Sequence, residues 1–274
     1  MKKTAYLSYL KMRVCCFACL VLLFACTPIQ PVGVNTLPEL KRLSVDSVKE
    51  STDKKMSPIR EQAMQDVALS LGAQAGLAVR AKQINTILDR QDKHLVQTFN
   101  FNLLLLPHNV LPPVLVEGRE MLKLDDENTI RLADRTYKIL KQARFVTAPP
   151  TWRDYLWLSY KNPEPPHHSL LPDNRIEQRV WDKFVTQGWE EGVRQADTIF
   201  AENLARLKEE YQGMILYRSL LTQGMVSAPF VGRSELGITG DSSNLRVNDQ
   251  VLRITALPAL QMNSQRWQPA AVSR

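Results

Sequence analysis

The chain has 274 residues, with 35 Lys and Arg residues against 28 Asp and Glu residues, and its isoelectric point is about 9.3. Four of the basic residues and none of the acidic ones lie within residues 1–25, so the rest of the chain carries a net charge of only +3. This modest charge, without any long run of Lys or Arg, argues against a protein that binds nucleic acid directly.

The first 26 residues have the pattern of a bacterial lipoprotein signal. Four basic residues come first: Lys2, Lys3, Lys11 and Arg13. The apolar stretch that follows, residues 14–25, is shorter than the roughly 20 residues that a membrane-spanning helix needs, and it suits the core of a signal peptide. Ala25 followed by Cys26 predicts cleavage after residue 25 and lipid on the Cys26 thiol, although Phe24 stands where such signals usually have a small residue. The alternatives are an ordinary secretion signal and an uncleaved anchor.

Cys26 is the last of the four cysteines, and the predicted lipid would occupy its sulfur. We therefore expect neither a disulfide nor a thiol nucleophile in the mature chain. Residues 26–57 contain several prolines and a polar stretch over residues 44–57, which predicts a lipidated flexible tether, disordered or loosely docked. Fully extended, about 30 residues span on the order of 100 Å. Residues 58–274 would then form one globular domain.

Ser57 followed by Pro58 predicts the start of a helix, with Ser57 as its N-cap. The helix would be unusually rich in Ala and Gly. Gly72 and Gly76 stand four residues apart on one face, so another element could approach closely there. We favour tight core packing over an oligomer contact at this face. Arg80 and the other charged residues of the segment exclude a membrane span.

The middle of the chain changes character from Phe99 onward. Residues 99–103 alternate apolar and polar like a strand, and Pro112-Pro113 marks a turn or an extended segment. Residues 129–146 fit either a helix or a hairpin that turns near residues 133–135, and we favour the hairpin.

The second half begins with a short helix over residues 151–157, with Thr151 as the expected cap, and a proline-rich loop follows it. Residues 174–222 carry the strongest helical periodicity of the chain, in which Gly188 and Gly192 predict a break between two helices.

The C-terminal region returns to strand character. Residues 245–255 predict a hairpin that turns at Asn248-Asp249, with one face covered and one face in water. The fold class expected overall is α+β and mainly α-helical, with long helices and small β-hairpins in the middle and near the C-terminus.

A search for chemistry finds no standard catalytic constellation. The chain has no nucleophile elbow, no phosphate-binding loop and no dinucleotide fingerprint. His167 and His168 are adjacent in the proline-rich loop and should point apart, and Asp125-Asp126-Glu127 suits a solvated turn better than a calcium loop. We therefore assign no catalytic, cofactor-binding or metal-binding residue and expect a protein that is not an enzyme. A pair of catalytic carboxylates assembled in space would not be visible in the sequence.

The most suggestive side chains are Trp152, Arg153, Tyr155 and Trp157, which cluster between two proline-rich segments. Trp, Tyr and Arg are the side chains that most often anchor protein interfaces, so these four form a candidate interface. The alternative is that Trp152 fills the core while Arg153 makes a local ion pair with Asp154.

Four stretches resemble the DotC family. They are the Pro-Pro-Thr-Trp-Arg-Asp-Tyr-Leu-Trp string of residues 149–157, residues 188–197, residues 246–254 and residues 108–114. The resemblance covers most of residues 57–268, and its most specific element is the Thr-Trp-Arg-Asp-Tyr-Leu string. DotC-type proteins are lipoproteins of type IVB secretion systems, and the TraI lipoprotein of IncI-type plasmids is their counterpart.

The resemblance implies a non-enzymatic part of an outer-membrane core complex without a cofactor. Its implied partners are a DotD-like lipoprotein and a DotH-like outer-membrane core protein, and a ring oligomer is expected. The lipid anchor would hold it on the periplasmic side of the outer membrane, because Thr27 rather than an inner-membrane retention Asp follows Cys26. Two alternatives remain open, a lipid-anchored cell-wall hydrolase and a solute-binding lipoprotein.

Overall fold

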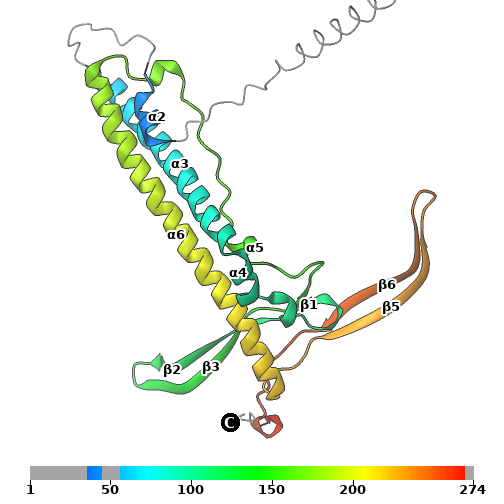
Figure 1. The fold of residues 1–274 in the computed structure, drawn as a ribbon. Helices are drawn as coiled ribbons and strands as arrows, with labels where there is room; N and C mark the ends of the chain where they lie inside the picture. Colours follow the sequence, from blue (N-terminus) through cyan, green and yellow to red (C-terminus); the bar gives the residue numbers. More distant parts are fainter. Residues whose placement is uncertain (1–35, 45–55, 269–274) are drawn as a thin grey trace, which may run out of the picture.

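The computed structural model describes residues 36–44 and 56–268 (Figure 1). The predicted signal peptide, its cleavage site at Ala25, the lipidation site Cys26 and most of the predicted tether lie outside the described residues. Within the described ranges, no helix has the length and apolar composition that crossing a bilayer takes.

Two long helices dominate the molecule, α3 (Pro58–Arg90) and α6 (Arg175–Thr222), and together they form a stalk (Figure 1). The helices run in the same direction, because Arg60 bonds Glu177 and Arg80 bonds Asp197. A parallel pair needs a long connection, and residues 157–174 provide its last part by returning along the stalk to the start of α6. α3 begins at the predicted position, although Ser57 caps it without a side-chain hydrogen bond.

Four glycines let α3 and α6 approach each other closely. A Cβ atom on Gly72 or Gly76 would stand 2.3 Å from a backbone oxygen of α6, at Val185 and Trp189. A Cβ atom on Gly192 would stand 2.0 Å from the Ala73 carbonyl oxygen of α3, and Gly188 makes the same kind of contact. The predicted close approach at Gly72 and Gly76 is confirmed, and the neighbouring element is α6 of the same chain.

The predicted break at Gly188 and Gly192 is wrong, because α6 is one continuous helix of 48 residues. Gly188 and Gly192 lie where the α3 backbone packs directly against α6, so there is no room for a side chain at either position. The helix therefore continues through them, although the apolar pattern in the sequence is interrupted there. A sequence pattern cannot distinguish a glycine that breaks a helix from one that admits a neighbour.

A short helix, α2 (Leu37–Arg42), packs against the first turns of the stalk. Leu40 is fully buried and its carbonyl oxygen accepts a hydrogen bond of 2.9 Å from the Trp181 indole. Thr36 and Glu39 close the start of α2 with reciprocal hydrogen bonds. This part of the predicted 26–57 tether is therefore a docked helix, because Leu40 gains a place in the core.

The other end of the stalk carries the largest core cluster, in which α4 (Asp92–Thr98), a 3₁₀ turn and α5 (Arg153–Leu156) pack on α3 and α6. The strand predicted over residues 99–103 is wrong, since Phe101–Leu104 form that 3₁₀ turn. Phe101 and Leu104 are both buried, and their spacing of three residues places them on one side of a 3₁₀ helix.

Residues 129–146 have the strand character of the favoured prediction, but the hairpin predicted within them, with its turn at residues 133–135, is wrong, because residues 129–141 form a single strand. Strand β2 (Val114–Asp126) pairs with β3 (Thr129–Lys141), so the chain reverses at residues 127–128. A second, short pairing joins β1 (Val110–Leu111) to β4 (Arg144–Phe145) and closes the base of this hairpin. Pro112-Pro113 forms the expected extended link between β1 and β2.

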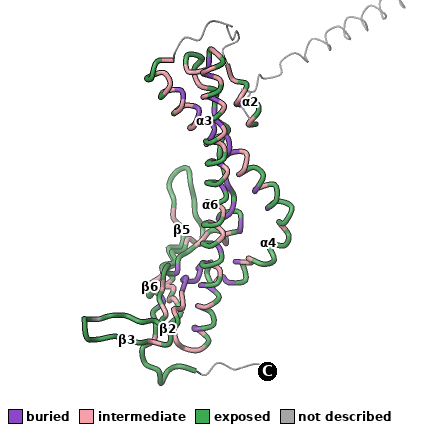
Figure 2. The backbone as a smooth tube through the Cα atoms, turned by 90° about the vertical axis from the view of Figure 1, so that its left-hand side faces the viewer, coloured by how far each residue is buried: buried purple, intermediate pink, exposed green. Residues whose placement is uncertain are grey.

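The C-terminal hairpin pairs β5 (Phe230–Gly240) with β6 (Leu245–Ala256), and its turn is at residues 241–244. Hydrogen bonds from Ser243 and Asn244 to the Asp241 carboxylate build this turn and lower the pKa of Asp241 to about 2. The turn predicted at Asn248-Asp249 is wrong, since Asn248 takes a positive φ of 57° within β6. Both faces are largely exposed, so the expected covered face is also absent (Figure 2).

The fold is α+β and mainly helical, as predicted, with hairpins in the middle of the chain and near its C-terminus. We call the β2/β3 hairpin the first arm and the β5/β6 hairpin the second arm. Both leave the stalk near its end distant from α2, on opposite sides in Figure 1.

Candidate interaction surfaces

The structure divides the predicted interface into core and surface residues. Trp152 is only 1% exposed and Tyr155 only 9%, so both belong to the core. The Trp152 indole nitrogen lies 3.3 Å from the Asp92 carboxylate, which accepts its hydrogen bond. Trp157, in contrast, is 42% exposed. Arg153 and Trp157 are therefore the part of the predicted interface that lies at the surface.

Arg153 ties α5 to the end of α3 and the start of α4. Its guanidinium nitrogens lie 2.9 Å from Asp89 and 3.2 Å from Asp92. The guanidinium carbon also lies 4.5 Å from the Trp152 ring centroid and 5.3 Å from that of Trp157, a cation–π arrangement with both. These contacts fix the Trp157 ring at the surface.

The local ion pair considered between Arg153 and Asp154 does not form. Asp154 instead accepts hydrogen bonds from the Thr151 backbone N–H, at 2.6 Å, and from its hydroxyl, at 2.9 Å. Thr151 thus donates to the helix rather than capping it as an acceptor, which corrects its predicted role.

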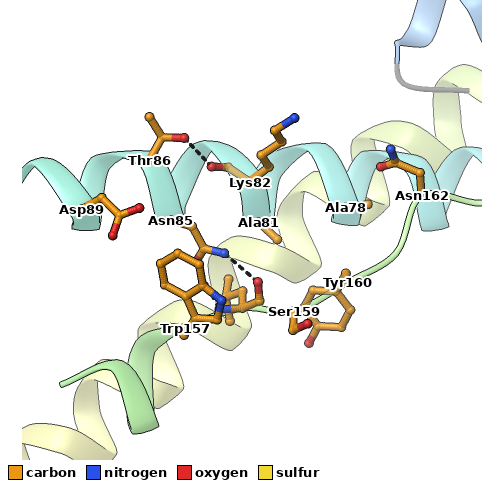
Figure 3. A pocket seen from close by; sticks show the side chains of 11 residues that line it. Ala78, Ala81, Lys82, Asn85, Thr86, Asp89, Trp157, Ser159, Tyr160 and Asn162 are labelled. Atoms are coloured by element: carbon orange, nitrogen blue, oxygen red, sulfur yellow. Dashed lines mark hydrogen bonds between the residues drawn. The ribbon is translucent and has the colours of Figure 1, made fainter. Parts of the chain in front are cut away.

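A groove of about 410 Å³ opens beside Trp157, between α3 and the returning segment (Figure 3). Ala78 and Ala81 line it from α3, while Trp157 and Tyr160 line it from the segment. Asn85 fixes the segment, because its amide donates to the Leu158 carbonyl at 2.7 Å and accepts from the Leu158 N–H at 3.1 Å. Lys82, Thr86 and Asp89 also line the α3 side, so the groove combines polar side chains with half-exposed aromatic rings, a mixture that is common at protein interfaces.

A buried carboxylate joins the first arm to the core. Glu210 of α6 accepts a hydrogen bond of 2.8 Å from the Tyr155 hydroxyl and forms an ion pair with Lys141 of β3. Burial, followed by the hydrogen bond to Glu210, raises the pKa of Tyr155 above its usual value. The Tyr155 hydroxyl therefore stays protonated and joins α5 to Glu210 of α6, while the Lys141 ion pair joins the base of the first arm to the same carboxylate.

The first arm exposes one apolar face near its tip. Leu122 pairs with Leu132 and Leu124 pairs with Ile130 across the two strands, so all four side chains point to the same side. They are between 54% and 77% exposed. On the opposite face, Lys123 pairs with Arg131.

The second arm exposes a comparable set of aliphatic side chains over its outer half. They are between 50% and 72% exposed: Leu236, Ile238, Leu245 and Val247. Each arm is an isolated two-stranded sheet, and Figure 2 shows both as almost entirely exposed. Monomeric proteins rarely expose apolar patches of this kind to water. An isolated two-stranded sheet is also only marginally stable in water, so each arm would gain stability from a contact that covers its apolar side chains.

These two patches were not recognised in the sequence. The sequence signal for the first patch is the alternation of Leu122 with Leu124 and of Ile130 with Leu132, but the sequence alone does not show that these two segments pair with each other. Without the correct register, the two pairs could not be placed on one face.

The histidines and acidic residues considered as metal ligands are not arranged as a site. His167 and His168 do not point apart as predicted, since a 3₁₀ turn brings their ring centroids to 4.1 Å. The Asp126 and Glu127 residues of the acidic triplet lie at the turn of the first arm. Within residues 36–44 and 56–268, no three His, Cys, Asp or Glu side chains gather to hold a metal ion.

One family model matches most of the chain. A family model described as "Type IV secretory system, conjugal DNA-protein transfer" matches residues 58–269. The matched range begins with α3 and includes both arms and the whole stalk. No curated protein matches the chain significantly.

Proposed function

The chain belongs to this type IV secretion family of conjugal DNA–protein transfer, and from this premise we propose that it is the DotC-type structural lipoprotein of a type IVB conjugation system. In this proposal it sits in the outer-membrane core complex and scaffolds a DotD-like lipoprotein and a DotH-like core protein. The proposal assigns it no catalytic reaction, no cofactor and no direct contact with nucleic acid.

The observation that supports a scaffold most strongly is the pair of arms. A rigid two-helix stalk presents two hairpins whose apolar side chains lie in water on both arms. Exposed apolar patches of this kind mark surfaces that partner proteins cover. Arg153, Trp157 and the neighbouring groove add a third candidate contact beside the core.

A lipid on Cys26 would also determine which end of the stalk lies near the membrane. α2 begins one residue after Thr36 and is docked on the start of the stalk. Only residues 27–35 would separate Cys26 from Thr36, and nine extended residues span about 30 Å. The start of the stalk would therefore lie near the outer membrane, and the arms would lie at the end facing the periplasm. This reach is much shorter than the 100 Å estimated for a wholly flexible tether.

Replacing the acylated residue tests the anchor. We expect Cys26→Ser to release the protein from the outer-membrane fraction and to reduce plasmid transfer strongly, because the thiol is the attachment point. Cys19→Ser is the matched control, since it changes a cysteine of the predicted signal peptide. Both effects are measured by membrane fractionation and by mating frequency. Unchanged outer-membrane fractionation of Cys26→Ser would refute the anchor.

Partner capture tests the scaffold. A tagged full chain solubilised from mating-competent cells should retain the DotD-like and DotH-like proteins. A chain that remains monomeric, binds no secretion component and is stabilised by a small solute would instead favour a solute-binding lipoprotein.

A further inference from the structure

The short helix α2 is held on the stalk by side chains of α6 (Figure 1). Leu40 is fully buried, and it is the only buried residue of the six in α2. The Trp181 indole N–H donates to the Leu40 carbonyl oxygen at 2.9 Å, and the Gln178 side-chain amide donates to the Lys41 carbonyl oxygen at 2.7 Å. Both oxygens belong to the last turn of a helix, where carbonyl groups lack the regular partner four residues ahead. Side chains of α6 therefore cap the C-terminus of α2.

These contacts imply that α2 folds only where it docks. A helix of six residues is far shorter than the roughly 12–15 residues that an isolated helix needs in water. Its N-terminal cap, made by Thr36 and Glu39, is local, but its C-terminal cap and the site for Leu40 both belong to the stalk. When α2 leaves α6 it loses both, and its backbone unfolds. α2 therefore has two states, folded on the stalk or unfolded and free of it.

The two long helices keep their own contacts in either state of α2. They meet at the four close glycine contacts and at the ion pair of Arg60 with Glu177, and these contacts do not involve α2. Leu37 and Leu43 are only partly buried beside Leu40. Elements with few buried side chains open locally at a lower free energy than the core on which they pack. α2 can consequently open while α3 and α6 stay together.

The state of α2 decides how much chain separates the predicted lipid on Cys26 from the stalk. With α2 docked, the connection is residues 27–35, nine residues that reach about 30 Å at full extension. With α2 released, the connection extends over residues 27–57, and these 31 residues reach on the order of 100 Å. Docking of α2 thus removes most of the available reach.

We propose that α2 is a releasable clasp that switches the tether between these two lengths. Docked, it holds the start of the stalk close to the outer membrane; released, it lets the same anchored protein stand farther into the periplasm. A pull on the stalk directed away from the membrane favours the released state, because only release lets the chain extend. The change of length rests on the proposed function, since it requires the lipid on Cys26, whereas docking and release of α2 do not.

Hydrogen exchange of the purified, lipidated full chain tests the clasp. The amides of residues 40–43 should exchange together and about ten-fold or more faster than the α6 amides near Gly188, because α2 opens without the stalk. Gln178→Ala removes the donor to the Lys41 carbonyl and should speed exchange in α2 several-fold while leaving α6 near Gly188 unchanged. Arg179→Ala, at the exposed neighbouring position of α6, is the matched control and should change neither.

Three results would overturn the clasp. Exchange of residues 40–43 as slow as that of α6 near Gly188 would mean that α2 opens only when the whole chain unfolds. Exchange at the rate of an unfolded peptide would mean that the docked state is not populated. Equal exchange in the native chain, in Gln178→Ala and in Trp181→Phe would mean that these side chains do not hold α2; Trp181→Phe removes the indole donor to Leu40.

Energy transfer to labelled lipid tests the change of length. A donor dye is attached to Gln62→Cys, an exposed position near the start of α3, in protein reconstituted into vesicles that contain a small fraction of acceptor-labelled lipid. Leu40→Asp places a charge in the buried site and should release α2. Transfer should then fall, because a flexible chain of 31 residues has roughly twice the root-mean-square span of one of nine. Pro38→Asp, at an exposed position in the first turn of α2, is the control and should leave transfer unchanged.

The two ways of failing are distinguishable. Equal energy transfer with and without Leu40→Asp, in protein whose α2 amides have lost their protection, would refute the change of length while the lipid anchor stands. Absence of energy transfer in the native background would refute the anchor on Cys26 and with it the membrane-bound scaffold of the proposed function.

Discussion

Glu177 shows how a single buried carboxylate fixes the start of the stalk. Its two oxygens accept hydrogen bonds from the Arg60 guanidinium at 2.7 and 2.9 Å, and one of them also accepts the Asp173 backbone N–H. Arg60 in turn donates to backbone carbonyls of the returning segment, at Ser169 and Leu171. One ion pair therefore joins α3, α6 and the segment that leads into α6.

This ion pair predicts a pH dependence of stability. The Arg60 hydrogen bond holds the pKa of Glu177 below its usual value of 4.5, so the folded state binds its proton less readily than the unfolded state. The stabilisation is fully present above about pH 4.5 and is lost as the pH falls through the lower folded pKa. In urea titrations, Glu177→Gln should therefore weaken the protein at pH 7 and flatten its pH dependence between pH 3 and pH 5. A slope equal to that of the native chain would contradict this assignment.

At the scale of elements, the stalk depends on backbone contact rather than on large side chains. Gly192→Ala would place a methyl carbon 2.0 Å from the Ala73 carbonyl oxygen, far inside van der Waals contact, and both atoms belong to packed helices. We expect a destabilisation of at least 1–3 kcal/mol, the usual range for overpacking. Gln74→Ala, at an exposed position of α3, is the control and should change stability little. Denaturant titration distinguishes the two, and equal midpoints would mean that the helices can separate without cost.

Substitutions in the first arm should affect plasmid transfer and folding stability differently, depending on whether they lie at its tip or at its base. Leu132 is 77% exposed at the tip, so Leu132→Glu should change the unfolding free energy by less than about 0.5 kcal/mol. It should nevertheless reduce plasmid transfer, because a charge then lies in the surface proposed to bind partners. Leu115 is buried at the base of the same arm, and Leu115→Ala should cost about 2–5 kcal/mol. Thermal unfolding and mating frequency are measured for both, and normal transfer by Leu132→Glu would count against a role for the tip.

The sequence indicates the type of most elements but not which ones meet. Helical periodicity located α3 and α6, and strand-like segments located β3 and β6, but each of these strands was predicted to be a whole hairpin and their partners β2 and β5 were not identified. The turns were misplaced because Asn248-Asp249 looks like a turn, whereas the chain reverses at residues 241–244. The docking of α2 was missed because its core contact, Leu40 with Trp181, joins residues that are far apart in the sequence. The sequence could not separate the buried Trp152 and Tyr155 from the exposed Trp157, because these neighbours differ in how the fold orients them.

At the scale of the whole molecule, the two hairpins and the docked helix occupy opposite ends of one rigid body (Figure 1). The three core clusters follow this order, with Leu40 and Trp181 at the start, Trp152 and Leu207 farther along, and Tyr217 at the last turns of α6. A helix of 48 residues is about 72 Å long, so what the arms bind is separated from α2 by most of that distance.

The parallel stalk also limits how the length of this protein can change. Arg60 with Glu177 and Arg80 with Asp197 are separated by the same interval of 117 residues, and the four glycine contacts keep the same alignment. An insertion of one turn into α6 alone would move every later contact by about 5.4 Å relative to α3. Natural variants of different length should therefore carry matched insertions or deletions at the same level of both helices.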